Sequence, residues 1–164
     1  MNYSAIKPCD IANGEGVRVS LFVSGCTHHC KGCFNESTWP FDSGEPFTPE
    51  VEDNILSLLE PEHIQGLSLL GGEPFEPQNQ AVLAPFLKRV RELFPQKDVW
   101  CYTGCVLERD LLSPTHWRTD VTDDMLSMID TLVDGPFVEE LKDISLKFRG
   151  SSNQRIIKLK ELES

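Results

Sequence analysis

Short apolar runs along this chain alternate with stretches in which apolar residues recur every three or four positions. Runs rich in β-branched, aromatic or leucine side chains predict buried β-strands. These runs lie at residues 17–23, 66–70, 99–102, 131–133 and 156–159. The stretches between them have helical spacing, so the pattern predicts strands and helices that follow one another in turn.

Local signals mark where the helices begin and end. Thr48 is a good N-cap, Pro49 suits the first helical position, and Pro61 ends the first helix. Pro85 lies inside the second helical pattern and predicts a kink or a restart there. The predicted helices cover residues 49–60, 82–94, 106–111 and 123–128.

This alternation favours an α/β fold with a parallel sheet and helices outside it. The 164 residues are most simply one domain, spanning 1–164. They fall short of the roughly 200 residues at the low end for a complete eight-stranded barrel. We therefore expect a partial, laterally open (β/α) barrel. A barrel open at its side admits part of another protein, whereas a closed one admits only small molecules.

Composition and charge exclude several classes of protein. The formal net charge is −11, from 15 basic and 26 acidic residues, which argues against a broad surface for nucleic acid or anionic membrane. No stretch approaches the roughly 18 apolar residues of a membrane helix, and the first residues lack the apolar core of a secretory signal. We expect a cytoplasmic protein, in which the six cysteines indicate metal binding or catalysis.

Three cysteines, Cys26, Cys30 and Cys33, follow the first predicted strand with three and then two residues between them. Thiolates are soft ligands that favour zinc, Cu(I) and iron–sulfur clusters. Structural zinc sites need four protein ligands, often as two separated pairs, and no second Cys-x-x-Cys is present. A [4Fe–4S] cluster is usually held by four thiolates. Three would leave one iron open to another ligand.

Other residues offer an alternative that the triplet alone leaves open. A zinc site could be completed by Cys9, His28 or His29. The two histidines are otherwise interpreted as loop residues, or as hydrogen-bond partners around the metal ligands. Cys9, Cys101 and Cys105 lack the spacing of a second cluster, and we expect them to act as small apolar residues with no assigned role.

The triplet, followed by the aromatic Phe34, resembles the signature of the radical S-adenosylmethionine (SAM) enzymes. In that superfamily the amino and carboxylate groups of SAM chelate the open iron. Flanking segments resemble the activating proteins of anaerobic ribonucleoside-triphosphate reductases and span nearly the whole chain. They are residues 10–18, 21–26, 35–39, 71–74, 133–135 and 149–154.

The resemblance implies a set of site residues. One [4Fe–4S] cluster would be held by Cys26, Cys30 and Cys33. SAM would contact Gly32, Cys33, Phe34, Gly71, Gly72 and Glu73. A glycine pair after a strand is by itself usually a turn. In this family it meets the amino group of SAM, because glycine exposes backbone carbonyls, while the Glu73 carboxylate adds negative charge or orders the loop.

The resemblance also implies a reaction. One electron from the reduced cluster cleaves SAM into methionine and a 5′-deoxyadenosyl radical, which takes a hydrogen atom from a glycine Cα of the reductase and leaves a glycyl radical. No catalytic side chain is required beyond the cluster and SAM. The implied partners are the reductase and a flavodoxin-like electron donor.

Two other functions stay open at this point. The chain could be a small radical SAM enzyme that acts on a small molecule, similar to 7-carboxy-7-deazaguanine synthase. It could also be a non-catalytic zinc-binding module, which would contain zinc and ignore SAM.

Three further segments have two interpretations each. Residues 13–18 form either a tight turn or a loop over the cluster, with Arg18 placed for a carboxylate or for the partner protein. Residues 134–137 form a turn or part of the active rim. Residues 149–154 form an ordered loop or a partner contact. Cys105 stands where we expect the family to carry tyrosine, which leaves any role of that position open.

Overall fold

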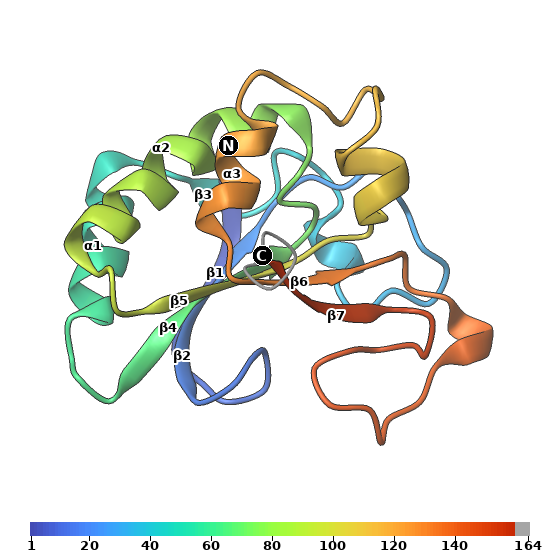
Figure 1. Cartoon of the computed structure of the whole chain (residues 1–164), viewed down its shortest axis with the longest axis horizontal. Coiled ribbons are helices and arrows are strands. Elements are labelled where there is room, and N and C mark those ends of the chain that lie inside the picture. The colour runs from blue at the N-terminus through green and yellow to red at the C-terminus, as the bar shows by residue number, and fades with distance from the viewer. Residues whose placement is uncertain (160–164) are drawn as a thin grey trace.

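The computed structural model describes residues 1–159, which fold around one mixed seven-stranded sheet (Figure 1). Its order is β3-β1-β2-β4-β5-β6-β7, so β3 and β7 are the edges. The neighbours β2, β4, β5 and β6 run parallel, while β1, β3 and β7 pair antiparallel. The strands are β1 (Asn2–Asp10), β2 (Val17–Val23), β3 (Glu45–Pro46), β4 (Ile64–Gly71), β5 (Asp98–Tyr102), β6 (Thr131–Asp134) and β7 (Arg155–Lys158).

Three α-helices lie on one side of this sheet (Figure 1). They are α1 (Pro49–Leu59), α2 (Pro77–Leu93) and α3 (Thr122–Met128). Short helical turns are η1 (Glu36–Thr38), η2 (Leu107–Leu111) and η3 (Glu139–Leu141). No helix within residues 1–159 is both long and apolar enough to cross a membrane.

The two faces of the sheet differ in character because successive strand residues point to opposite sides. Val19, Leu21 and Leu69 are fully buried and join the apolar core with helix residues. The alternate positions Ser20 and Ser68 are polar, yet they are fully buried too. The face away from the helices is therefore buried as well, and these two positions belong to a polar layer beside apolar residues such as Trp100.

Arg18 is the centre of that polar layer. Its guanidinium is fully buried and forms an ion pair with Asp98, with 2.7 Å between Nη1 and Oδ1. It also donates hydrogen bonds to Ser68 Oγ (2.7 Å) and to the Leu67 carbonyl (2.9 Å). Ser68 in turn donates to the Asn13 carbonyl (2.5 Å). Arg18 therefore faces a carboxylate of its own chain and anchors the loop before β2.

Most predicted elements are present, with three differences. Residues 2–10 form β1, which was not predicted, because this strand is mostly exposed or half-buried and contains Pro8. The two-residue strand β3 was also missed. Pro85 does not divide the second helix, since α2 is continuous and begins at Pro77, earlier than predicted. The predicted partial barrel stays a prediction at this point.

Candidate functional site

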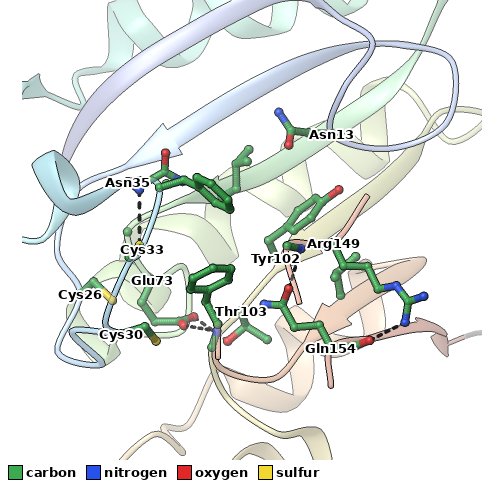
Figure 2. Close-up of a pocket in the computed structure, with 18 of the residues that line it drawn as sticks. Asn13, Cys26, Cys30, Cys33, Asn35, Glu73, Tyr102, Thr103, Arg149 and Gln154 are labelled. Atoms are coloured by element: carbon green, nitrogen blue, oxygen red, sulfur yellow. Dashed lines mark hydrogen bonds between the residues drawn. The ribbon is translucent and has the colours of Figure 1, made fainter. Parts of the chain in front are cut away.

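A pocket of about 460 Å³ lies where the parallel strands end (Figure 2). Its lining includes Cys26 after β2, Gly72 after β4, Thr103 after β5 and Gly135 after β6. The carboxyl ends of parallel strands are the usual place for ligands in α/β proteins, because the loops there converge.

All three predicted metal ligands line this pocket. Cys26, Cys30 and Cys33 come from the loop after β2, and Figure 2 shows them together at one end of the pocket. All three thiols are free of disulfides. The tight path of the loop requires positive backbone angles at Gly25 (φ 103°) and Gly32 (φ 75°). The three cysteines therefore line one pocket, and their role as ligands of one metal group stays a prediction.

Burial makes these thiols unfavourable as isolated anions. It raises the pKa of Cys26 to about 12, with a further contribution from the nearby Glu73 carboxylate. Burial is also the main cause that raises the pKa of Cys30, and the neighbouring Cys33 adds to it. A bound cationic metal centre would offset these costs by stabilising the thiolates. The donor set thus fits a metal group better than it fits free thiolates.

The candidate fourth ligands for a zinc site are oriented elsewhere. The His28 ring stacks on Trp117 at 4.7 Å, and its Nε2 lies 2.7 Å from a Glu73 oxygen. His29 stacks on Trp39 at 4.5 Å. Cys9 is exposed on β1 and is not part of the pocket lining. Each of the three residues that could complete a zinc site therefore has other contacts or lies outside the pocket lining.

Glu73 connects three of the loops around the pocket. Its side chain is 1% exposed, and its Oε1 accepts hydrogen bonds from His28 Nε2 and the Gly104 amide, both at 2.7 Å. Its Oε2 accepts from the Phe75 amide (2.9 Å) and from Thr103 Oγ1 (2.7 Å). Of the two roles expected for this carboxylate, the geometry supports ordering the loops, because its acceptor positions are occupied.

The glycine pair before Glu73 packs closely against the end of β2 and the start of the cysteine loop. Gly72 donates its amide to the Val23 carbonyl (2.9 Å). A Cβ at Gly71 would lie 2.5 Å from Val23 O, and one at Gly72 would lie 2.6 Å from Gly25 O. Only glycine permits this approach, so the two predicted segments form one unit.

Among the described residues, His28, Glu73 and Cys105 form a cluster of possible metal ligands, with ligand atoms within 4.8 Å of one another. The Glu73 oxygens are already hydrogen-bonded, and burial raises the pKa of the Cys105 thiol far above its usual value. We therefore interpret this cluster as a hydrogen-bonded support for the loop. Cys101 and Cys105 are buried in the core, as expected. Cys9 is exposed, which differs from the expectation that it is a small apolar residue.

The other end of the pocket comes from segments whose role the sequence left open. Arg149, Gly150 and Gln154 line it, and the loop is ordered by Gln154. Its Oε1 accepts from the Gly150 amide (2.9 Å), while its Nε2 donates to the Gly135 carbonyl (3.0 Å). Hydrogen bonds therefore order residues 149–154, while their interpretation as a partner contact stays a prediction.

Of two aromatic residues in the pocket, one was missed by the sequence analysis and the other was named by it. Tyr102 lines the pocket but was missed, because its only signal is its place at the end of a strand. Phe34 was expected from the family resemblance to contact SAM. It lies at the pocket's mouth, 65% exposed, with its ring 5.1 Å from that of Phe137.

Comparison with known proteins gives a consistent result. Residues 12–157 match the family model described as a 4Fe-4S single cluster domain. The chain is 48% identical over 158 residues to the anaerobic ribonucleoside-triphosphate reductase-activating protein of Pasteurella multocida, covering 95% of this chain and 96% of that protein. The protein of the same name from Escherichia coli K12 is 47% identical over 156 residues, with 94% and 96% covered. That of Enterobacteria phage T4 is 41% identical over 157 residues, with 95% and 93% covered.

Proposed function

This chain belongs to the family of anaerobic ribonucleoside-triphosphate reductase-activating proteins, and from this premise we propose that it activates such a reductase by radical SAM chemistry at the cysteine pocket. One observation carries the proposal. Three free cysteines share a pocket with the Gly71–Gly72 turn, while the neighbouring His28 and His29 are stacked on tryptophan rings.

Cys26, Cys30 and Cys33 would hold the [4Fe–4S] cluster. When bound, the cluster with SAM at its open iron supplies the one-electron chemistry that removes a hydrogen atom from a glycine Cα of the reductase. The chain supplies position and shielding. Aromatic rings of Phe22, Phe137 and other residues in the pocket lining keep water and stray hydrogen donors away from the reacting groups.

The contacts with SAM are assigned to backbone and ring groups. Gly71 and Gly72 present their backbone at the pocket beside the cysteine loop, which suits an ammonium group. Gly32 and Cys33 contribute backbone from the cysteine loop, and Phe34 covers the mouth. Glu73 acts indirectly, since its oxygens hold the surrounding loops.

The route for the partner protein depends on the shape of the sheet. We propose that it forms the laterally open, partial barrel expected from the sequence. In support, β3 and β7 are the two edges of the sheet, and its helices cover only one face. The pocket lies at the ends of the strands with Phe34 exposed at its mouth. A glycine-bearing segment of the reductase would enter there, and a flavodoxin-like protein would deliver the electron.

The test uses anaerobically reconstituted protein mixed with SAM, a strong reductant and the reductase. Electron paramagnetic resonance is recorded, and 5′-deoxyadenosine is assayed. We expect a glycine-centred doublet on the reductase that requires SAM. Deoxyadenosine without that doublet would contradict the assignment of the reductase as substrate.

The variant Cys26→Ala provides the control. It should abolish SAM cleavage and leave the fold largely intact, as judged by circular dichroism. Global unfolding of this variant, together with zinc in the wild-type protein, would instead favour a structural zinc site.

A further inference from the structure

We propose that residues 136–150, between β6 and β7, form the docking surface for the reductase, with Leu141 and Ile144 as its apolar contacts. We call these residues the mouth segment. The inference rests on the proposed function and specifies where the protein substrate is held outside the pocket. Figure 1 shows the mouth segment, which includes η3, projecting from the sheet between β6 and β7.

The mouth segment borders the pocket and the cysteine loop. Phe137, Leu146 and Phe148 are part of the pocket lining. The ring of Phe34 lies 5.1 Å from that of Phe137, and the Lys142 ammonium lies 5.0 Å from the centre of the Phe34 ring. The mouth segment therefore forms one side of the mouth at which Phe34 is exposed, so a protein that enters there contacts it.

Two large apolar side chains of the mouth segment are exposed to solvent. Ile144 is 92% exposed, and Leu141 is exposed as well. Seven large apolar side chains are exposed within residues 1–159, and three of them, Phe34, Leu141 and Ile144, belong to this side of the mouth. The other four come from four separate parts of the chain. Exposed apolar groups that gather at one place mark an interaction surface, because a partner removes them from water.

The part of the mouth segment that carries Ile144 is ordered by its own hydrogen bonds. Lys142 pairs with Ser151 in an antiparallel bridge. Oδ1 of Asp143 accepts hydrogen bonds from the Ser145 amide (2.9 Å) and from the Ser145 hydroxyl (2.6 Å). These polar contacts hold the turn, while the side chain between them points to solvent. A preorganised surface loses little conformational freedom on binding.

Both ends of this exposed stretch are anchored to the rest of the molecule. At the first end, Phe137 packs on Phe34 of the cysteine loop. At the other end, the ring of Phe148 meets the buried Trp100 of β5 edge-on at 5.2 Å. Phe148 has a positive φ of 63°, which is uncommon for a bulky residue, so its conformation is set by its surroundings.

The charge of the mouth segment narrows the chemistry of its partner. Three acidic and three basic residues give it a net charge of zero, in a chain whose formal net charge is −11. Long-range electrostatic attraction therefore contributes little here. The mouth segment suits an apolar, uncharged patch of a protein, and we assign to it the patch beside the glycine segment of the reductase.

Continuity with the pocket favours the reductase over other partners. The mouth segment turns Leu146 and Phe148 into the pocket and Ile144 out to solvent. One protein can therefore enter the pocket and cover the exposed surface at the same time. A second copy of this chain, or an electron donor, would stand in the path of the substrate if it bound there.

The test compares Ile144→Glu and Leu141→Glu with the control Leu93→Glu in the reconstituted holoprotein. Leu93 is 55% exposed and ends α2 just before β5 begins, so it lies at the end of the sheet away from the pocket. The affinity for the reductase is measured anaerobically. SAM affinity, iron content and SAM cleavage without the reductase are measured on the same samples.

We expect Ile144→Glu to weaken reductase binding at least tenfold, which corresponds to about 1.4 kcal/mol. Leu141→Glu should act in the same direction, and Leu93→Glu should leave the affinity unchanged. SAM affinity, iron content and SAM cleavage without the reductase should stay the same in all three variants. Ile144→Lys should weaken binding too, because it also removes the apolar contact.

Four results would overturn the proposal. The first is unchanged reductase affinity in both Ile144→Glu and Leu141→Glu. The second is a loss with Ile144→Glu that Ile144→Lys does not show, which would assign the effect to charge. The third is a wild-type dimer that Ile144→Glu dissociates, which would assign the surface to a second copy of the chain. The fourth is slower reduction by a flavodoxin-like donor with unchanged reductase affinity.

Failure of the proposed function would look different. In that case the wild-type holoprotein would not cleave SAM or generate a glycyl radical at all. Failure of the docking surface alone would leave both reactions intact and the Glu variants equal to the wild-type protein in reductase binding. A thermal melt of each variant shows whether weaker binding reflects loss of the fold.

Discussion

Replacing His28 by alanine should loosen the cysteine loop from the rest of the pocket. The side chain is 14% exposed, and its Nε2 bonds to the buried Glu73 carboxylate at 2.7 Å. A hydrogen bond to a charged group contributes about 1.5–3 kcal/mol, and stacking on Trp117 adds about 0.5–1.5 kcal/mol. Local opening of the loop should therefore become easier by about 2–4 kcal/mol.

The neighbouring residue provides a matched control. His29 also stacks on a tryptophan, Trp39, at 4.5 Å, but it is exposed and, within residues 1–159, has no bond to a buried carboxylate. His29→Ala should therefore cost only the stacking contribution, about 0.5–1.5 kcal/mol. His28→Gln, which keeps an N–H donor, should restore part of the loss in His28→Ala.

The assay is the rate at which a chelator removes iron from the reconstituted protein, since removal requires the loop to open. A change of about 2 kcal/mol corresponds to roughly a 30-fold faster release. Equal release rates for His28→Ala and His29→Ala would refute the reasoning. They would show that the bond between His28 and Glu73 does not hold the loop.

Three other substitutions test the surrounding structure. Gly72→Ala places a Cβ 2.6 Å from the Gly25 carbonyl oxygen, so it should displace the cysteine loop. The free energy of unfolding should fall by about 1–3 kcal/mol. Urea titration and the iron content of the reconstituted protein would both show the loss. Arg18→Met leaves Asp98 without its buried partner. It should lower the free energy of unfolding, measured by urea titration, by about 3 kcal/mol. A loss below about 1 kcal/mol would contradict this prediction. Burial alone would raise the pKa of Asp10, but the hydrogen bonds that it accepts outweigh burial and lower the pKa below its usual 3.8. Its contribution to stability is therefore present above about pH 4 and lost as the pH falls through the lower folded pKa. In urea titrations at several acidic pH values, the free energy of unfolding of Asp10→Asn should therefore fall less steeply with decreasing pH than that of the wild-type protein.

Elements with a strong local pattern could be predicted from the sequence. The strand predicted at residues 17–23 has the bounds of β2, because buried apolar positions recur along its whole length. β1 could not be predicted in this way. Lys7 and Pro8 interrupt its pattern, and it is held by antiparallel pairing with β2 and β3. Its stability comes from distant neighbours, which no local window contains.

The same distinction applies to the site. The cysteine triplet is a local motif, so its place in one loop at the pocket could be predicted from spacing alone. The anchoring of His28 by Glu73 could not, because it depends on loops that meet only in the folded sheet. Tyr102 was missed for the same reason, since it belongs to no local motif.

The Glu73 carboxylate also bears on how the site is made in the cell. Its bonds to His28, Thr103 and Gly104 join residues 45, 30 and 31 positions away along the chain. Such non-local contacts form late in folding, because the intervening chain must first be closed into loops. The cysteine loop thus takes its final shape only after β2, β4 and β5 have aligned. Iron that reaches a newly synthesised chain before that alignment meets three separate thiols, so productive loading belongs to the folded protein.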